Sequence, residues 1–176
     1  MKNLKKVAKS VYYSKKDKDY LLVSKKDISF IKAKKRLLNS KSRICTHSKI
    51  TEKIHEMLIF HKKNSYVRPH KHLNRLESFH LISGEIYLII FNDKGKPTKV
   101  IEMGDYSTGK IFYYRMYKSC FHTLIIKKDA LFHEVTSGPF KKKDTIFSDW
   151  SPDEKNKKNV KKFINNLKSN LKLESF

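Results

Sequence analysis

The chain has 176 residues, of which 39% are hydrophobic and 12% aromatic, and this composition excludes disorder of the whole chain. The length fits one domain with terminal extensions. The formal charge of +23 favours anionic partners such as nucleic acid, acidic lipid or phosphorylated sugars, although a compositional bias toward Lys, Asn and Ile explains the charge equally well. Because Arg, the residue suited to bidentate base and phosphate contacts, occurs at only five positions, we expect no specific nucleic-acid partner.

The cysteines and the N-terminus predict the compartment. Cys45 and Cys120 are far apart in the sequence and predict a reducing environment without a disulfide framework. Residues 1–9 lack the apolar segment of a secretory signal. No run approaches the roughly 18 apolar residues of a membrane span, so we expect a cytoplasmic protein without a transmembrane segment.

The first 50 residues predict a Lys-rich extension followed by a helix. Residues 1–19 are expected to be a loosely docked lead-in. Ser24 is a candidate N-cap for an amphipathic helix that ends near Asn39–Ser40. Residues 41–53 are polar and are expected to cross the end of a barrel. His47 lies among them; we expect a surface residue, or one that supports the ligands or faces a substrate, rather than a metal ligand.

Residues 51–152 predict the main domain, an all-β sandwich or barrel. Short apolar runs alternate with turns every 8 to 12 residues, and the segment 92–97, Asn-Asp-Lys-Gly-Lys-Pro, is typical of a hairpin turn. There is no βαβ alternation. The expected strands are 57–60, 66–72, 78–82, 85–91, 98–101, 111–117, 122–127 and 130–136.

Residues 153–176 predict a basic C-terminal helix. Apolar residues recur at helical spacing, and the opposite face is Lys and Asn. We expect the apolar stripe to dock on the domain itself or on a partner subunit; contact with an anionic membrane is the alternative. The stripe consists of Val160, Phe163, Ile164, Leu167 and Leu171.

Four residues form a candidate metal site. His70 and His72 are two apart, so on a strand both imidazoles point to the same face. Glu77 and His122 complete a set of three imidazoles and one carboxylate, which suits a divalent transition metal such as Fe, Mn, Zn or Ni. Because Glu77 is an odd number of residues from His72, a turn or bulge must separate them. The alternative is that the histidines are ordinary polar residues on a strand.

The same residues carry a resemblance to a known family. The pattern His70-x-His72-x4-Glu77-x6-Gly84 resembles the first cupin motif, and His122 is placed like the histidine of the second. The resemblance implies a cupin-type double-stranded β-helix with one metal in its mouth, and a homodimer. The Pro-x-Gly turn that usually precedes the second histidine is absent here. His122 is therefore the least secure ligand; Cys120 could share its face as a thiolate, or be a small buried residue.

Within the cupins, the sequence resembles the WbuC-type cupin fold metalloproteins over about residues 20–152. That resemblance implies a role in bacterial surface-polysaccharide biosynthesis, such as O-antigen, lipopolysaccharide or capsule, with no settled reaction. The motifs that carry it are Arg43-x-Cys45-x-His47, the segment 66–72, Glu134-x3-Gly138-Pro139-Phe140, Asp144, Phe147 and Trp150-Ser151-Pro152.

Five further residues are candidates for contact with a small anionic or sugar-like ligand. Arg68 shares the parity of the histidines, but could instead pair with a protein acid at the rim. Tyr113 and Arg115 could form a wall for a sugar ring, or be core and surface residues. His80 and Glu134 are candidate acid–base groups, and Glu134 could equally help to close the barrel end.

Three functions fit these residues. The first is a metal-dependent sugar or nucleotide-sugar isomerase or epimerase, and its metal set also suits an Fe(II) dioxygenase. The second is a metal-binding cupin that binds or senses a sugar without turnover. The third, a nucleic-acid-associated protein, rests on the charge alone and requires a steep salt dependence of DNA binding.

Overall fold

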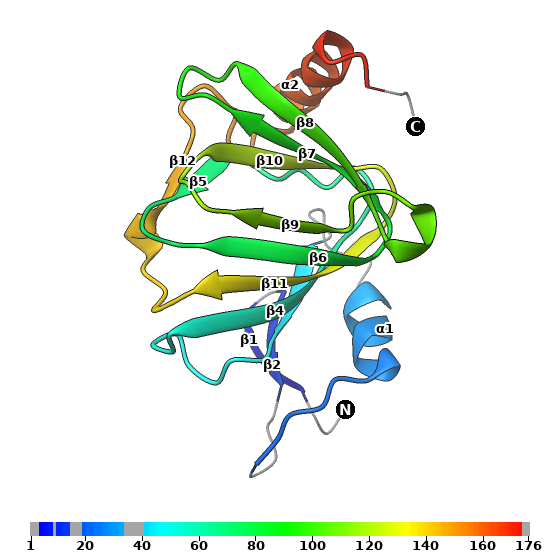
Figure 1. Cartoon of the computed structure of the whole chain (residues 1–176), viewed down its shortest axis with the longest axis vertical. Helices are drawn as coiled ribbons and strands as arrows, with labels where there is room; N and C mark the ends of the chain where they lie inside the picture. Colours follow the sequence, from blue (N-terminus) through cyan, green and yellow to red (C-terminus); the bar gives the residue numbers. More distant parts are fainter. Residues whose placement is uncertain (1–3, 9, 15–18, 34–40, 174–176) are drawn as a thin grey trace.

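The protein is described by a computed structural model, which covers residues 4–8, 10–14, 19–33 and 41–173. Its strands form two sheets that face each other as a sandwich (Figure 1). The seven-stranded sheet has the order β1 (Leu4–Ala8), β2 (Val11–Ser14), β3 (Lys41–Cys45), β4 (Ile54–His61), β11 (Ala130–Ser137), β6 (Glu77–Ser83) and β9 (Tyr113–Met116). The five-stranded sheet has the order β12 (Thr145–Phe147), β5 (His70–His72), β10 (Phe121–Ile126), β7 (Glu85–Phe91) and β8 (Pro97–Gly104).

The main core lies between the two sheets. Strand β7 is apolar almost throughout because both of its faces are covered. Ile86 and Leu88 point inward and are fully buried against Phe79 and Phe132 of the opposite sheet, whereas Tyr87 points to the outer face. Because side chains alternate along a strand, β7 contributes to the core between the sheets with one face and to the packing on the outer side with the other.

Helix α2 (Lys157–Asn170) covers the outer face of the five-stranded sheet (Figure 1). Its apolar side chains, among them Phe163 and Leu167, pack against Phe121 and Ile125. The predicted amphipathic helix is confirmed, and its stripe docks on the domain itself. Within the described residues, no helix has the length and apolar character needed to cross a bilayer.

Helix α1 (Lys25–Ala33) covers the outer face of the seven-stranded sheet, where Ile31 packs with Ile44. The predicted N-cap is confirmed: the Ser24 hydroxyl accepts a hydrogen bond from the Asp27 amide (3.4 Å), and Asp27 accepts one from the Ser24 amide (2.9 Å). The predicted end near Asn39–Ser40 lies outside the described residues.

The expectation of a loosely docked N-terminus is wrong for the described part of it. Strand β2 pairs in parallel with β3, and β1 pairs with β2, so three strands before residue 50 join the sheet. Tyr12 is only 4% exposed because its ring packs with Ile31 and Phe30 beneath α1. One buried aromatic among exposed lysines was too weak a local pattern to predict a strand.

Two single-turn 3₁₀ helices, η1 (Tyr106–Thr108) and η2 (Lys142–Asp144), lie in connections between strands. The predicted hairpin turn after β7 is confirmed, since the Asn92 side-chain oxygen accepts hydrogen bonds from the Lys94 and Lys96 amides.

One buried histidine in the core should make stability depend on pH. His61 is buried beside Phe132, and its Nδ1 has no hydrogen-bond partner among the described groups. Burial, with the charges of Lys41 and Arg43, lowers the pKa of His61 to about 3. The unfolded chain binds this proton below about pH 6.5 and the folded chain does not, so the neutral ring destabilises the fold progressively as pH falls from 6.5 toward 3.

We therefore expect His61→Leu to gain stability relative to the wild type as the pH is lowered below 6.5, by up to about 1.4 kcal/mol per pH unit. Urea unfolding at about pH 7.5, about pH 6 and about pH 5 measures the difference in the free energy of unfolding. The matched control is His80→Leu, because His80 is exposed on the sheet surface. A difference between wild type and His61→Leu that stays constant with pH would contradict the prediction.

Candidate metal centre

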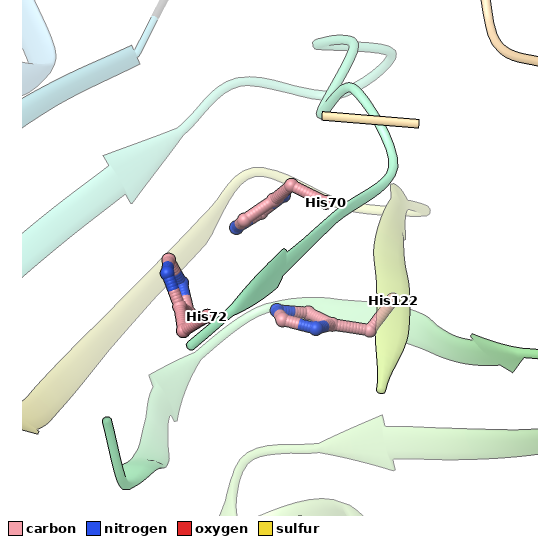
Figure 2. A group of neighbouring side chains, drawn as sticks. All are labelled: His70, His72 and His122. Carbon is pink, nitrogen blue, oxygen red and sulfur yellow. The ribbon is translucent and has the colours of Figure 1, made fainter. Parts of the chain in front are cut away.

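Two neighbouring strands of the five-stranded sheet bring three histidines together. His70 and His72 lie on β5, and His122 on β10 is the direct register partner of His70. Leu124 and Ile126, which share the parity of His122, belong to the core between the sheets, so His122 points inward. Figure 2 shows the three rings turned toward one another.

Each imidazole is held by a hydrogen bond at Nδ1. His70 Nδ1 donates to the Arg68 carbonyl (2.8 Å), and His122 Nδ1 donates to the Cys120 carbonyl (3.0 Å). His72 Nδ1 lies 3.2 Å from the Thr145 hydroxyl. Because a carbonyl oxygen only accepts, Nδ1 carries the proton in the first two rings, and the neutral tautomer leaves the Nε2 lone pair free to bind a metal.

The three histidines could hold one metal ion. One ring nitrogen from each lies within 4.8 Å of the other two, the separation expected for ligands that share an ion at about 2 Å. Nitrogen donors that are uncharged and already oriented suit Fe, Mn, Zn or Ni, and this donor set does not distinguish among them.

Glu77 reaches the histidines from the opposite sheet. It begins β6 of the seven-stranded sheet, and its carboxylate oxygens lie 3.1 Å from His72 Nε2 and 3.4 Å from His122 Nε2. The predicted turn is present, with Asn74 in the left-handed region at a φ of 55°. Strand parity does not relate Glu77 to His72, because the chain changes sheets between them. Glu77 is therefore the candidate fourth ligand.

Burial and charge act in opposite directions on these groups. Burial raises the pKa of Glu77, but the adjacent His122 and His72 outweigh it and hold that pKa well below its ordinary value. Burial lowers the pKa of His122, and the Glu77 carboxylate more than reverses this. His70 has less compensation, so burial and the nearby His122 lower its pKa to about 3. The site thus keeps a carboxylate ionised and one imidazole neutral across physiological pH.

Glu134 faces the same interior from β11. It pairs with Phe79, whose side chain is in the core, so Glu134 shares the inward face of the sheet with Glu77. Burial and the negative charge of Glu77 raise the pKa of Glu134 to about 8. A carboxyl group with this pKa exchanges its proton near neutral pH, as an acid–base group requires.

The other sequence candidates lie elsewhere. Arg68 forms an ion pair with Asp153 (3.1 Å), and its guanidinium lies 5.2 Å from the centroid of the Phe147 ring. Arg68 therefore pairs with a protein acid at the rim, which was the alternative to contact with a ligand. His80 is exposed opposite Tyr113 on the outer face of the sheet, and Arg115 shares that face. The structure does not bring His80, Tyr113 or Arg115 to the histidine cluster. Their strand neighbours Phe79 and Tyr114 point into the core, so these three side chains point to the opposite face.

Cys45, His47 and Cys120 also lie outside the ligand group. His47 is buried and stacks on His55 with ring centroids 4.1 Å apart. Sequence reasoning missed Thr145, which orients His72 from β12, since Thr145 is the register partner of His72. Strand β12 has only three residues, which is too short for an alternation of polar and apolar side chains to predict it from sequence.

Comparison with known proteins identifies the fold. A family model described as a domain of unknown function (DUF6016) matches residues 32–103. No curated protein matches the sequence. Among solved structures, protein SO0799 from Shewanella oneidensis aligns with a TM-score of 0.50 and 12% identity, over 63% of this chain and 75% of that one. The two facing sheets and the three grouped histidines agree with this structural likeness. The chain has a cupin fold.

Two larger proteins are also similar to this chain. Oxalate decarboxylase from Bacillus subtilis aligns with a TM-score of 0.46 and 18% identity, over 71% of this chain and 30% of that one. The capsular polysaccharide assembling protein CapF from Staphylococcus aureus aligns with a TM-score of 0.45 and 16% identity, over 55% of this chain and 27% of that one. The chain therefore spans less than a third of either protein's length.

Proposed function

We propose that this protein is a metal-dependent cupin enzyme that acts on a sugar or nucleotide-sugar intermediate of bacterial surface-polysaccharide biosynthesis, as an isomerase or epimerase. The observation that carries the proposal is the grouping of His70, His72 and His122, each held at Nδ1 and each with one ring nitrogen within 4.8 Å of the other two. The polysaccharide assignment rests on the resemblance of the sequence motifs to the WbuC-type proteins.

The side chains present fit one divalent transition metal. The three imidazoles are borderline nitrogen donors, and the Glu77 carboxylate would compensate part of the positive charge of the ion. When bound, the ion would supply a Lewis acid that polarises a carbonyl oxygen of the sugar. His70 and His122 remain oriented through their carbonyl partners, and Glu77 provides the negative charge.

Glu134 is the proposed acid–base residue. It faces the interior from the sheet that also carries Glu77, and its pKa of about 8 leaves it mostly protonated at pH 7. It can therefore give a proton to a substrate oxygen or carbon and take one back, which isomerisation and epimerisation both require.

The test is turnover of candidate sugar nucleotides by metal-loaded protein, followed by NMR of the products. We expect Glu134→Gln to lower kcat by at least about a hundredfold while the metal content stays unchanged. Glu56→Gln is the matched control, since Glu56 lies on β4 beside β11 with an exposed side chain and should retain full activity.

Three outcomes would contradict the proposal or a part of it. Tight binding of a sugar nucleotide without any product would indicate the non-catalytic sugar-binding cupin. Oxygen consumption by the Fe(II)-loaded protein with such a substrate would indicate the dioxygenase reaction. Full activity of Glu134→Gln would remove Glu134 from the reaction.

A further inference from the structure

Loops at the metal-bearing end of the sandwich expose several large apolar side chains. Ile50 is 56% exposed, Ile54 61%, Leu73 38%, Leu76 43% and Phe140 43%. We call these five residues the rim patch. Single exposed apolar residues are ordinary on a protein surface, whereas a contiguous group marks a site of interaction.

Backbone hydrogen bonds hold the segments that carry the patch side by side. The Phe140 amide donates to the Ile50 carbonyl (2.9 Å), and the Ser137 amide donates to the Leu76 carbonyl (3.1 Å). Ser137 is also the register partner of Ile54. The loop before β4, the loop before β6 and the loop after β11 are thus joined along one edge, on the left of Figure 1.

The patch borders the candidate metal centre. Leu73 follows the ligand His72 directly, and Leu76 precedes Glu77. The Leu73 amide donates to the Asp144 carbonyl (2.7 Å), which connects this loop to the segment that leads to β12. A surface on which the patch docks would therefore lie at the mouth of the site.

Exposed lysines surround the patch. They lie on the same loops, two before β4 and three after Phe140, and they are Lys49, Lys53, Lys141, Lys142 and Lys143. Of the acids on these loops, Glu52 accepts hydrogen bonds from the Ser48 and Lys49 amides, and Asp144 is half-buried. The rim therefore combines apolar side chains with a local excess of positive charge.

We propose that the rim patch docks on an anionic lipid surface, with the mouth of the site toward the lipid. Ile, Leu and Phe side chains enter the boundary between headgroups and acyl chains, and lysines beside them contact anionic headgroups. The apolar stripe of α2 is already packed on the sheet, so that helix has only its lysine face to offer.

The charge and composition disfavour other occupants. A second copy docked on this patch would bring five lysines from each chain together, and like charges repel. Nucleic acid would use the lysines but leave the aliphatic side chains without a role, since recognition of single strands uses aromatic and Arg contacts. An anionic bilayer satisfies both components at once.

The apolar component is tested by cosedimentation of the full chain with vesicles of phosphatidylcholine and phosphatidylglycerol. We expect the double variant Ile50→Ser/Phe140→Ser to bind at least roughly tenfold more weakly than the wild type. The matched control is Ile82→Ser/Ile111→Ser, because Ile82 (44% exposed) and Ile111 (54% exposed) have similar exposure away from the rim. The control should bind as the wild type does.

The charged component is tested by reversal of three lysines. We expect Lys141→Glu/Lys142→Glu/Lys143→Glu to lose roughly tenfold or more in vesicle binding. The variant Lys158→Glu/Lys161→Glu/Lys162→Glu on the exposed face of α2 changes the net charge by the same amount and should bind much more strongly than the rim variant. Equal thermal unfolding of all four variants would show that the fold is intact.

Five results would overturn the proposal. Three concern vesicles: equal binding by the rim and α2 charge variants, binding of the wild type that does not depend on phosphatidylglycerol, and wild-type affinity in Ile50→Ser/Phe140→Ser. The fourth is a wild-type dimer in sedimentation velocity that the rim variants convert to monomer, because the patch would then serve a second copy. The fifth is loss of DNA binding alone in those variants, because the patch would then serve a nucleic acid.

Discussion

Replacement of His122 by alanine is expected to abolish stoichiometric metal binding, with at least about a hundredfold loss of affinity. The reason is that His122 Nε2 is one of three ring nitrogens within 4.8 Å of one another, and its tautomer is held by the Cys120 carbonyl. His70→Ala should have the same effect. Elemental analysis of untagged protein purified without chelator, near one metal per chain for the wild type, measures the result.

The matched control is His80→Ala, which removes an imidazole from the exposed outer face of the same domain and should keep the metal. Metal retained in His122→Ala would mean that the strand without a Pro-x-Gly turn does not supply a ligand. A wild type that holds no metal even after reconstitution would overturn the metalloenzyme proposal and leave a metal-free sugar-binding barrel.

Gly84→Ala is expected to lower the free energy of unfolding by at least about 4 kcal/mol, a loss large enough to unfold many domains. Gly84 has a φ of +98°, which side chains rarely adopt. A Cβ there would lie 2.2 Å from the Asp129 carbonyl oxygen and 2.8 Å from the Ala130 Cα. Both contacts are with backbone, so a rotamer change cannot relieve them. Urea unfolding followed by circular dichroism measures the effect.

Gly109→Ala separates backbone strain from steric overlap. Gly109 also has a positive φ, +68°, but a Cβ there would meet no atom within 4 Å. We expect a cost of only about 1 kcal/mol. Equal losses for the two variants would mean that the close approach of Asp129 to Gly84 does not contribute to stability.

The strands of the main domain could be predicted because their patterns are local. Strand β7, with seven consecutive residues of almost continuous apolar character, and the Asn92 turn after it identify a buried hairpin without any tertiary information. The N-terminal strands could not be predicted in this way. Residues 4–14 are rich in Lys, and their pairing is stabilised by a partner strand near residue 43 and by burial of Tyr12 beneath α1.

The candidate ligands were also predictable, because each is marked by residue type and spacing. The alternation that places His70 and His72 on one face follows from strand geometry alone. What spacing could not decide is the direction of Tyr113 and Arg115. Parity assigns each side chain to one of two faces, but only the packing of Phe79 and Tyr114 determines which face is inside.

The sequence by itself therefore determined the β class of the domain, the capped helix, the amphipathic C-terminal helix and the identity of four candidate ligands. Tertiary structure alone decided that Glu77 approaches from the opposite sheet, that Thr145 and two backbone carbonyls orient the imidazoles, and that apolar loops meet at the rim. The physical reason is range: periodicity and capping act within a few residues, whereas the pairing of distant strands depends on the free energy of packing the whole core.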